Sequence, residues 1–189
     1  DKNGVALILG DNFFYAQSLT KTLQNATKLR NGAKVFLHPV SNPKLYGIAS
    51  IKNKKIVSLK EKPTSTNSNL AVTGLYFFDK NVVSISKTLK PSKRNELEII
   101  DIINKYLKIS KLKHVPMKTG AAWLDAGNPK SLLQASQWVQ TIQDRQKYLI
   151  GSPELSALKK KLITKKQYIN LIKNYKDSNY KNELLNFVV

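Results

Sequence analysis

The sequence predicts an α/β protein with a mixed sheet, an inserted hairpin and a group of C-terminal helices. Short apolar runs of strand length alternate with segments of helical period, which is the pattern of a sheet covered by helices. Two alternating segments flank Asn53-Lys54 and indicate a hairpin. After residues 151–153 the chain becomes lysine-rich with short helical periods. We therefore expect an α/β core over residues 1–147 and a small helical appendage over residues 148–189.

The first expected strand, residues 4–10, is apolar and closed by a glycine, so it should be buried on both faces. Asp11 and Asn12 would then lie at its carboxyl end, where open α/β sheets bind ligands. Gly74 interrupts a long apolar strand, which marks the close approach of another backbone or of a ligand, or else a strand that merely tolerates glycine. Further strands are expected over residues 34–40, 47–51, 55–59, 70–78 and 112–117.

Helices are expected where apolar residues recur at spacings of three and four. Asp79 is expected to cap one of them, and Asn128-Pro129 has the order of cap and proline that starts a helix. The expected helices cover residues 16–29, 82–89, 96–109 and 129–145.

The composition excludes several classes of protein. A chain of 189 residues that is 41% hydrophobic can bury a full core. It contains no cysteine, which excludes a disulfide framework, a thiolate zinc site and a cysteine nucleophile. The first residues lack a signal-peptide pattern, and no segment reaches membrane-spanning length. We therefore expect a soluble, cytoplasmic protein without a membrane partner.

The net charge of +20 is compatible with a nucleic-acid partner. The charge is mostly lysine spread along the chain, and arginine occurs only at Arg30, Arg94 and Arg145. Lysine lacks the planar fork that grips phosphates bidentately and reads base edges. A solvated lysine surface is therefore the favoured interpretation.

Two aspartates are the candidate metal ligands. Asp11 in LGDN and Asp125 in WLDAG each lie on an expected turn at a strand end. Magnesium is normally held by one or two carboxylates together with substrate phosphates. The alternative is that each aspartate caps a turn or helix.

Glu61-Lys62-Pro63 closes an expected strand and is a candidate contact to a phosphate. Proline ends the ladder and holds the approach rigid, so Lys62 is presented as a fixed positive charge. Glu61 can accept hydrogen bonds from sugar hydroxyls. The alternative is a solvent-facing Glu-Lys pair.

Arg94 and Trp123 are further candidates. Arg94 precedes an expected helix and could contact a phosphate, although a surface arginine is as common there. Trp123 stands two residues before Asp125 and could stack on a sugar or base, or it could be ordinary core.

Taken together, these motifs resemble the glucose-1-phosphate thymidylyltransferase family of sugar nucleotidyltransferases. They follow one another in that family's order: LGDN, Tyr46-Gly47, Glu61-Lys62-Pro63, Val72 to Tyr76, Arg94 to Asp101 and Trp123 to Gly127. The resemblance implies a Rossmann-like nucleotidyltransferase fold, of which this chain is the C-terminal part. It also implies Mg²⁺-dependent transfer of dTMP from dTTP to glucose 1-phosphate, with release of pyrophosphate, in dTDP-rhamnose biosynthesis.

The resemblance assigns roles to individual residues. Asp11 and Asp125 match the metal ligands, and Lys62 and Arg94 match the sugar-phosphate contacts, which we take as the catalytic residues. The positions that match the sugar-binding and substrate-lining residues are Tyr46, Gly47, Glu61, Val72, Tyr76 and Trp123. Such enzymes are typically homotetramers with a second, regulatory nucleotide site.

The sequence also departs from the family pattern. Before residue 4 there is no glycine-rich loop to hold the triphosphate, and Asn95 stands where glycine is usual. We therefore expect an incomplete enzyme that is inactive by itself. The alternative is a non-catalytic module, either a regulatory partner of a full-length homologue or a basic nucleic-acid binder.

Overall fold

The computed structural model describes residues 3–92 and 95–187, which form two compact units divided between Ser131 and Leu132. The division lies near the start of α4 (Pro129–Gln146), so most of this helix belongs to the second unit. The domain boundary expected near residue 147 stays a prediction.

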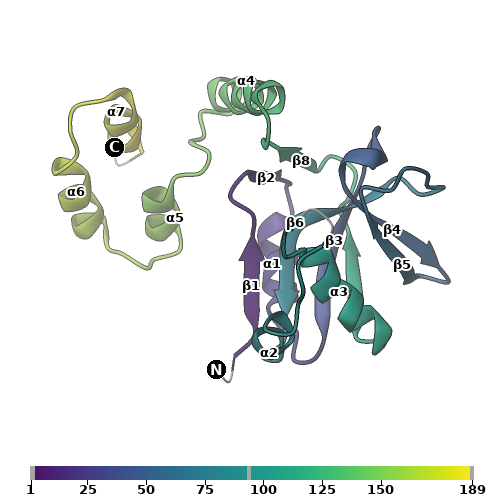
Figure 1. The fold of residues 1–189 in the computed structure, drawn as a ribbon. Coiled ribbons are helices and arrows are strands. Elements are labelled where there is room, and N and C mark those ends of the chain that lie inside the picture. Colours follow the sequence, from purple (N-terminus) through teal and green to yellow (C-terminus); the bar gives the residue numbers. More distant parts are fainter. Residues whose placement is uncertain (1–2, 93–94, 188–189) are drawn as a thin grey trace. The chain divides into compact units, whose positions relative to one another are not determined.

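The first unit is built on a six-stranded mixed sheet (Figure 1). Five of its strands follow the order β5-β4-β6-β3-β7, and the sixth, β1, pairs with β6 outside this order. The strand β6 (Leu70–Phe78) is central, because β3 pairs with one edge and β4 and β1 share the other. Among the strands of the described residues, β3 and β7 are the one parallel pair, which agrees with the expected mixed sheet. The remaining strands of this sheet are β1 (Val5–Ile8), β3 (Ala33–Pro39), β4 (Gly47–Lys52), β5 (Lys55–Glu61) and β7 (Leu112–Pro116).

Apolar residues that alternate along the strands cover both faces of this sheet. On one face, Val35 and Leu37 pack with Ile103 and Tyr106 of α3 (Ile99–Lys108). On the other, Phe36 and its neighbours pack against α1 (Leu19–Ala26). Figure 1 shows α3 in front of the sheet and α1 behind it. The helix α2 (Val82–Ser86) packs on the same face as α3 through Val82. The short helix η1 (Pro43–Leu45) precedes β4.

The strand β1 corrects one expectation. All four of its residues are exposed, and Ile8 retains 57% of its accessible surface, so burial on both faces was wrong. Among the described residues, β1 pairs along one edge with β6 and has no further strand beside it. A fully apolar strand predicts burial only when neighbouring elements cover both faces.

Asp79 is a buried anchor instead of the expected helix cap. Asn81 occupies the N-cap position of α2, while the Asp79 carboxylate accepts hydrogen bonds from the backbone N–H groups of Gly32 and Asn81 and from the hydroxyl of Tyr106. The carboxylate therefore ties the start of β3 to α3. Burial opposes ionisation, but these hydrogen bonds outweigh it and lower the pKa of Asp79.

The second unit contains α4 and three short helices, α5 (Pro153–Lys159), α6 (Lys165–Lys173) and α7 (Asn179–Asn186). Each short helix begins at a hydroxyl cap, because Ser152, Thr164 and Ser178 accept a hydrogen bond from a backbone N–H of the first turn. Tyr168, Ile172 and Leu184 are fully buried at the centre of this unit. In the part of the chain that the structure describes, no helix combines the length and apolar character needed to cross a bilayer.

Candidate active site

Asp11 and Asp125 are brought together by a small ladder outside the main sheet. The strands β2 (Asn12–Tyr15) and β8 (Ala122–Asp125) pair antiparallel and place Asn12 opposite Asp125. The backbone N–H of Ala126 donates to the carbonyl of Asp11 at 2.8 Å, which extends the pairing by one residue. The two aspartates therefore lie side by side although they are far apart in the sequence.

The two carboxylates face the same small space beside Gly127. A Cβ atom at Gly127 would lie 3.0 Å from Asp125 Oδ1 and 3.1 Å from Asp11 Oδ2. A side chain at this position would crowd both oxygens, so glycine keeps the space open. Asp125 Oδ1 also accepts a hydrogen bond from the Gly127 backbone N–H, as the capping alternative predicts. Capping and ligation are compatible, because a carboxylate oxygen has more than one lone pair.

This donor set fits a hard divalent cation. Two carboxylates are the ligand set expected for Mg²⁺, which fills its other positions with water and substrate phosphates. The described residues contain no group of three or more His, Cys, Asp or Glu side chains that could hold a metal without substrate.

Asn12 connects the carboxylate pair to the rest of the site, a role that the sequence interpretation missed. Its Nδ2 donates to Asp11 Oδ1 at 2.8 Å, and its Oδ1 accepts from the Gly74 N–H at 3.1 Å and from Trp123 Nε1 at 2.6 Å. A Cβ atom at Gly74 would lie 2.5 Å from Asn12 Cγ. The group that approaches Gly74 is therefore the side chain of Asn12, where a backbone or a ligand was expected.

A cleft of about 210 Å³ lies beside the carboxylates and collects most of the predicted substrate residues. Lys62 has a positive φ of 40°, and its backbone N–H donates to the Tyr46 carbonyl at 3.0 Å. A Cβ atom at Gly47 would lie 3.0 Å from Glu61 Oε2, so glycine leaves room for that carboxylate. The predicted residues that line the cleft are Tyr46, Gly47, Glu61, Lys62, Val72, Tyr76, Trp123 and Asp125.

The pKa values of two tyrosines that line the cleft are raised by burial and by nearby carboxylates. Burial and the negative charge of Asp125 raise the pKa of Tyr46. Burial, followed by the charges of Glu61 and Asp11, raises the pKa of Tyr76. Both phenols stay protonated at neutral pH. The charges of Asp11, Glu61 and Asp125 are thus close enough to the cleft to act on groups that line it.

Arg94 lies outside the described residues, so its predicted contact with the sugar phosphate stays a prediction. The next residue, Asn95, adopts a φ of +59°. Asparagine enters this left-handed region more readily than most residues other than glycine. The replacement of the family's usual glycine is therefore compatible with the turn before α3.

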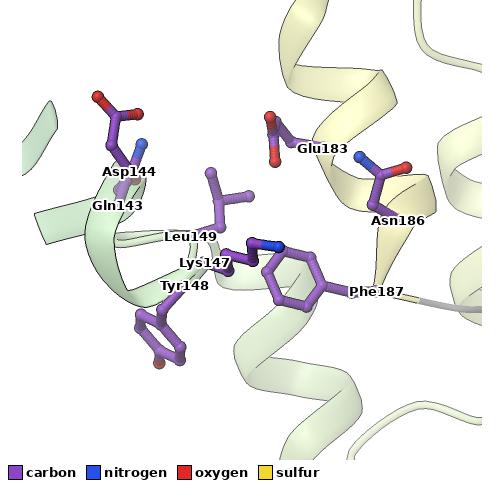
Figure 2. Close-up of a pocket in the computed structure, with 8 residues that line it drawn as sticks. All are labelled: Gln143, Asp144, Lys147, Tyr148, Leu149, Glu183, Asn186 and Phe187. Atoms are coloured by element: carbon purple, nitrogen blue, oxygen red, sulfur yellow. The ribbon is translucent and has the colours of Figure 1, made fainter.

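A larger cavity of about 550 Å³ lies in the second unit, between the end of α4 and α7 (Figure 2). Its walls carry the side chains of Asp144, Lys147, Glu183 and Phe187. Of the predicted substrate and metal residues that the structure describes, none lines this cavity. The smaller cleft is the better candidate, because it adjoins the paired carboxylates, an aromatic platform and a lysine.

The family model described as nucleotidyl transferase matches residues 1–142. The chain is 44% identical over 153 residues to the glucose-1-phosphate thymidylyltransferase of Neisseria meningitidis, covering 80% of this chain and 53% of that protein. It is 40% identical over 185 residues to the enzyme of the same name from Neisseria gonorrhoeae, covering 97% of this chain and 64% of that protein. The chain thus spans between about half and two thirds of the length of these curated relatives.

Solved structures agree on the fold. A Bacillus anthracis protein described as a glucose-1-phosphate thymidylyltransferase, solved in complex with sucrose, superposes with a TM-score of 0.64 at 42% identity, covering 72% of this chain and 55% of that one. A UDP-glucose pyrophosphorylase complexed with UDP-glucose shares the fold at 23% identity and a TM-score of 0.63, covering 74% of this chain and 57% of that one. The architecture is therefore the Rossmann-like nucleotidyltransferase fold. Because the family model matches residues 1–142, and because the motifs that carry Asp11 and Asp125 meet beside one cleft, we conclude that the chain belongs to the nucleotidyl transferase family.

Proposed function

We propose that this chain provides the sugar-phosphate and metal-binding part of a site that transfers dTMP from dTTP to glucose 1-phosphate. The observation that carries the proposal is the convergence of Asp11 Oδ2 and Asp125 Oδ1 beside Gly127, next to a cleft that presents Lys62 and Trp123. The names of the two curated relatives described above, both glucose-1-phosphate thymidylyltransferases, support this choice of sugar phosphate and nucleotide.

The cleft residues suit a sugar phosphate. Tyr46 and Trp123 present tilted rings with centroids 5.1 Å apart, a surface on which the apolar face of a sugar can rest. Glu61 can accept hydrogen bonds from sugar hydroxyls, and Lys62 can place a positive charge on the phosphate, with Arg94 as its partner. These two cations would offset the repulsion between the phosphate and the carboxylates of the site.

In the proposed reaction a phosphate oxygen of glucose 1-phosphate attacks the α-phosphorus of dTTP. A new P–O bond forms there, the bond to the β-phosphate oxygen breaks, and pyrophosphate leaves with the electron pair. The task of the protein is to align nucleophile and phosphorus and to stabilise the developing charge. Mg²⁺ held by Asp11 and Asp125 would supply charge neutralisation on the phosphate oxygens.

Several finer features belong to the same proposal. By analogy with the family we propose a cytoplasmic homotetramer whose product enters dTDP-rhamnose biosynthesis. We expect residues 1–189 by themselves to be inactive, because the relatives carry a third to nearly half of their length outside the matched region. The alternatives of a regulatory partner or a basic nucleic-acid binder remain, and the charge of +20 is the observation that favours the latter.

Calorimetry on the purified chain tests the proposal. Glucose 1-phosphate should bind in the presence of Mg²⁺, and Asp11→Asn should weaken the Mg²⁺-dependent part of the binding. A matched control is Asp177→Asn, an exposed aspartate in the second unit. If Lys62→Ala leaves the affinity for glucose 1-phosphate unchanged, the assignment of the cleft is refuted.

Two further measurements separate the alternatives. Synthesis of dTDP-glucose from dTTP and glucose 1-phosphate by the chain alone would contradict the expected inactivity and leave the site assignment intact. DNA or RNA binding that falls steeply with salt would favour the nucleic-acid alternative.

A further inference from the structure

His38 lies behind the aromatic platform of the cleft and has no role in the function proposed above. It is placed near the end of β3, opposite Ala71 of β6. Its Nδ1 atom is buried without a hydrogen-bond partner among the described residues. A buried polar atom without a partner costs free energy, so this nitrogen does not stabilise the fold and attention turns to the contacts of the ring.

The ring of His38 contacts Trp123. The two ring centroids lie 6.1 Å apart with an interplanar angle of 73°, which is an edge-to-face arrangement. Such pairs are favourable when the positive edge of one ring meets the negative face of the other. Burial lowers the pKa of His38, so the imidazole is neutral at neutral pH and meets Trp123 as an uncharged ring.

Trp123 is thereby contacted by residues from three separate parts of the chain. Asn12 accepts the hydrogen bond of the indole N–H, Tyr46 packs against the ring, and His38 meets it edge-to-face. Asn12 and Tyr46 line the cleft themselves, whereas His38 does not. His38 therefore reaches the cleft through its ring contact with Trp123.

We propose that His38 is a positioning residue that fixes the orientation of Trp123 and so shapes the sugar platform of the cleft. The inference rests on the proposed function only for the nature of the ligand, because the orientation of Trp123 can be measured without one. The aromatic ring at position 38 is the feature that matters, and the unpaired nitrogen is not.

The test uses the full chain with Trp138→Phe, which leaves Trp123 as its tryptophan reporter. In His38→Ala, the quenching of Trp123 fluorescence by acrylamide should rise and its near-ultraviolet circular dichroism should weaken, while the far-ultraviolet spectrum stays unchanged. His38→Phe keeps a ring without the nitrogen and should behave like the parent. His114→Ala is the matched control, because His114 lies on β7 and has no ring contact with Trp123 among the described residues.

The functional arm measures binding of glucose 1-phosphate with Mg²⁺ in the same proteins. His38→Ala should weaken binding by about two- to tenfold, the range that an edge-to-face aromatic pair supplies, and His38→Phe should restore it. Unchanged quenching in His38→Ala overturns the inference, as does equal loss in the alanine and phenylalanine variants.

The Trp123→Ala variant distinguishes failure of the proposed function from failure of the positioning role of His38. If glucose 1-phosphate binds equally well without Trp123, the sugar platform of the proposed function fails, while the quenching result still decides the role of His38. If Trp123→Ala weakens binding and His38→Ala changes neither quenching nor binding, the role of His38 fails and the proposed function stands.

Discussion

Replacing Glu154 with glutamine should destabilise the C-terminal unit by an amount that depends on pH. In the first turn of α5 the Glu154 carboxylate accepts hydrogen bonds from Tyr175 at 2.5 Å, from Tyr180 at 2.6 Å and from Ser152 Oγ at 3.0 Å. Tyr175 follows α6 and Tyr180 belongs to α7, so one carboxylate joins three helices. Burial alone would raise the pKa of Glu154, but these hydrogen bonds outweigh it and lower the pKa to about 2.

The size of the effect follows from this shift. A fall from the ordinary value of 4.5 to about 2 sets a ceiling of about 3 kcal/mol on the stabilisation by the ionised carboxylate. Because the carboxylate is partly exposed, solvent screening reduces the expected contribution to about 1–2 kcal/mol. A lowered pKa gives stability that is fully present above pH 4.5 and is lost as the pH falls towards 2.

The assay is urea unfolding at several pH values, followed by Trp138 fluorescence in a Trp123→Phe background. Trp138 belongs to the second unit and therefore reports on its unfolding. Glu154→Gln should be less stable at pH 7, and the difference should vanish near pH 2. Asp177→Asn is the control, because this exposed carboxylate pairs with Lys181 at the surface and should contribute little. Equal stability at pH 7, or a difference that persists unchanged at pH 2, would refute the reasoning.

Three further substitutions test other parts of the fold and the site. Gly74→Ala should displace the side chain of Asn12 and cost about 1–3 kcal/mol in urea unfolding; unchanged stability would mean that the strand relaxes freely. Asp79→Asn should destabilise the first unit by about 1–3 kcal/mol in the same assay, because the hydroxyl of Tyr106 and two backbone N–H groups lose a charged acceptor. Unchanged stability would show that the asparagine amide accepts these hydrogen bonds as well as the carboxylate does. Asp125→Asn should weaken Mg²⁺-dependent binding of glucose 1-phosphate in calorimetry by about tenfold or more, and retention of full affinity would remove Asp125 from the metal site.

The elements with the strongest local patterns were predictable from the sequence. The hairpin around Asn53-Lys54 forms β4 and β5, and both turn residues have positive φ, as a tight hairpin turn requires. The long apolar strand over residues 70–78 is observed with the same bounds. In these cases turn chemistry and hydrophobic run length determine the outcome without tertiary contacts.

Features that depend on distant partners were not predictable. The role of Asn12 requires Gly74 and Trp123, which lie 62 and 111 residues further along the chain. Asp79 has the local sequence of a helix cap, yet only one of its three donors, the Asn81 N–H, is local, and the other two come from just before β3 and from α3. A single sequence shows that such side chains are polar, and the fold determines which donors reach them.

The placement of Asp11 shows why the site holds its geometry despite the exposure of β1. The apolar side chains of β1 stay partly accessible, so packing holds Asp11 less firmly than it would at the end of a buried strand. Hydrogen bonds at the carboxyl end of β1 add to the anchoring. Leu9 N–H donates to the Gly74 carbonyl, Ala126 N–H donates to the Asp11 carbonyl, and Asn12 bonds to the Asp11 carboxylate. The partners of these hydrogen bonds lie on β6 and just after β8, and both strands also line the cleft. The same strands therefore set the distance between Asp11 and Asp125. The carboxylate pair should therefore be more sensitive to substitutions at Gly74 and Asn12 than to polar replacements within β1.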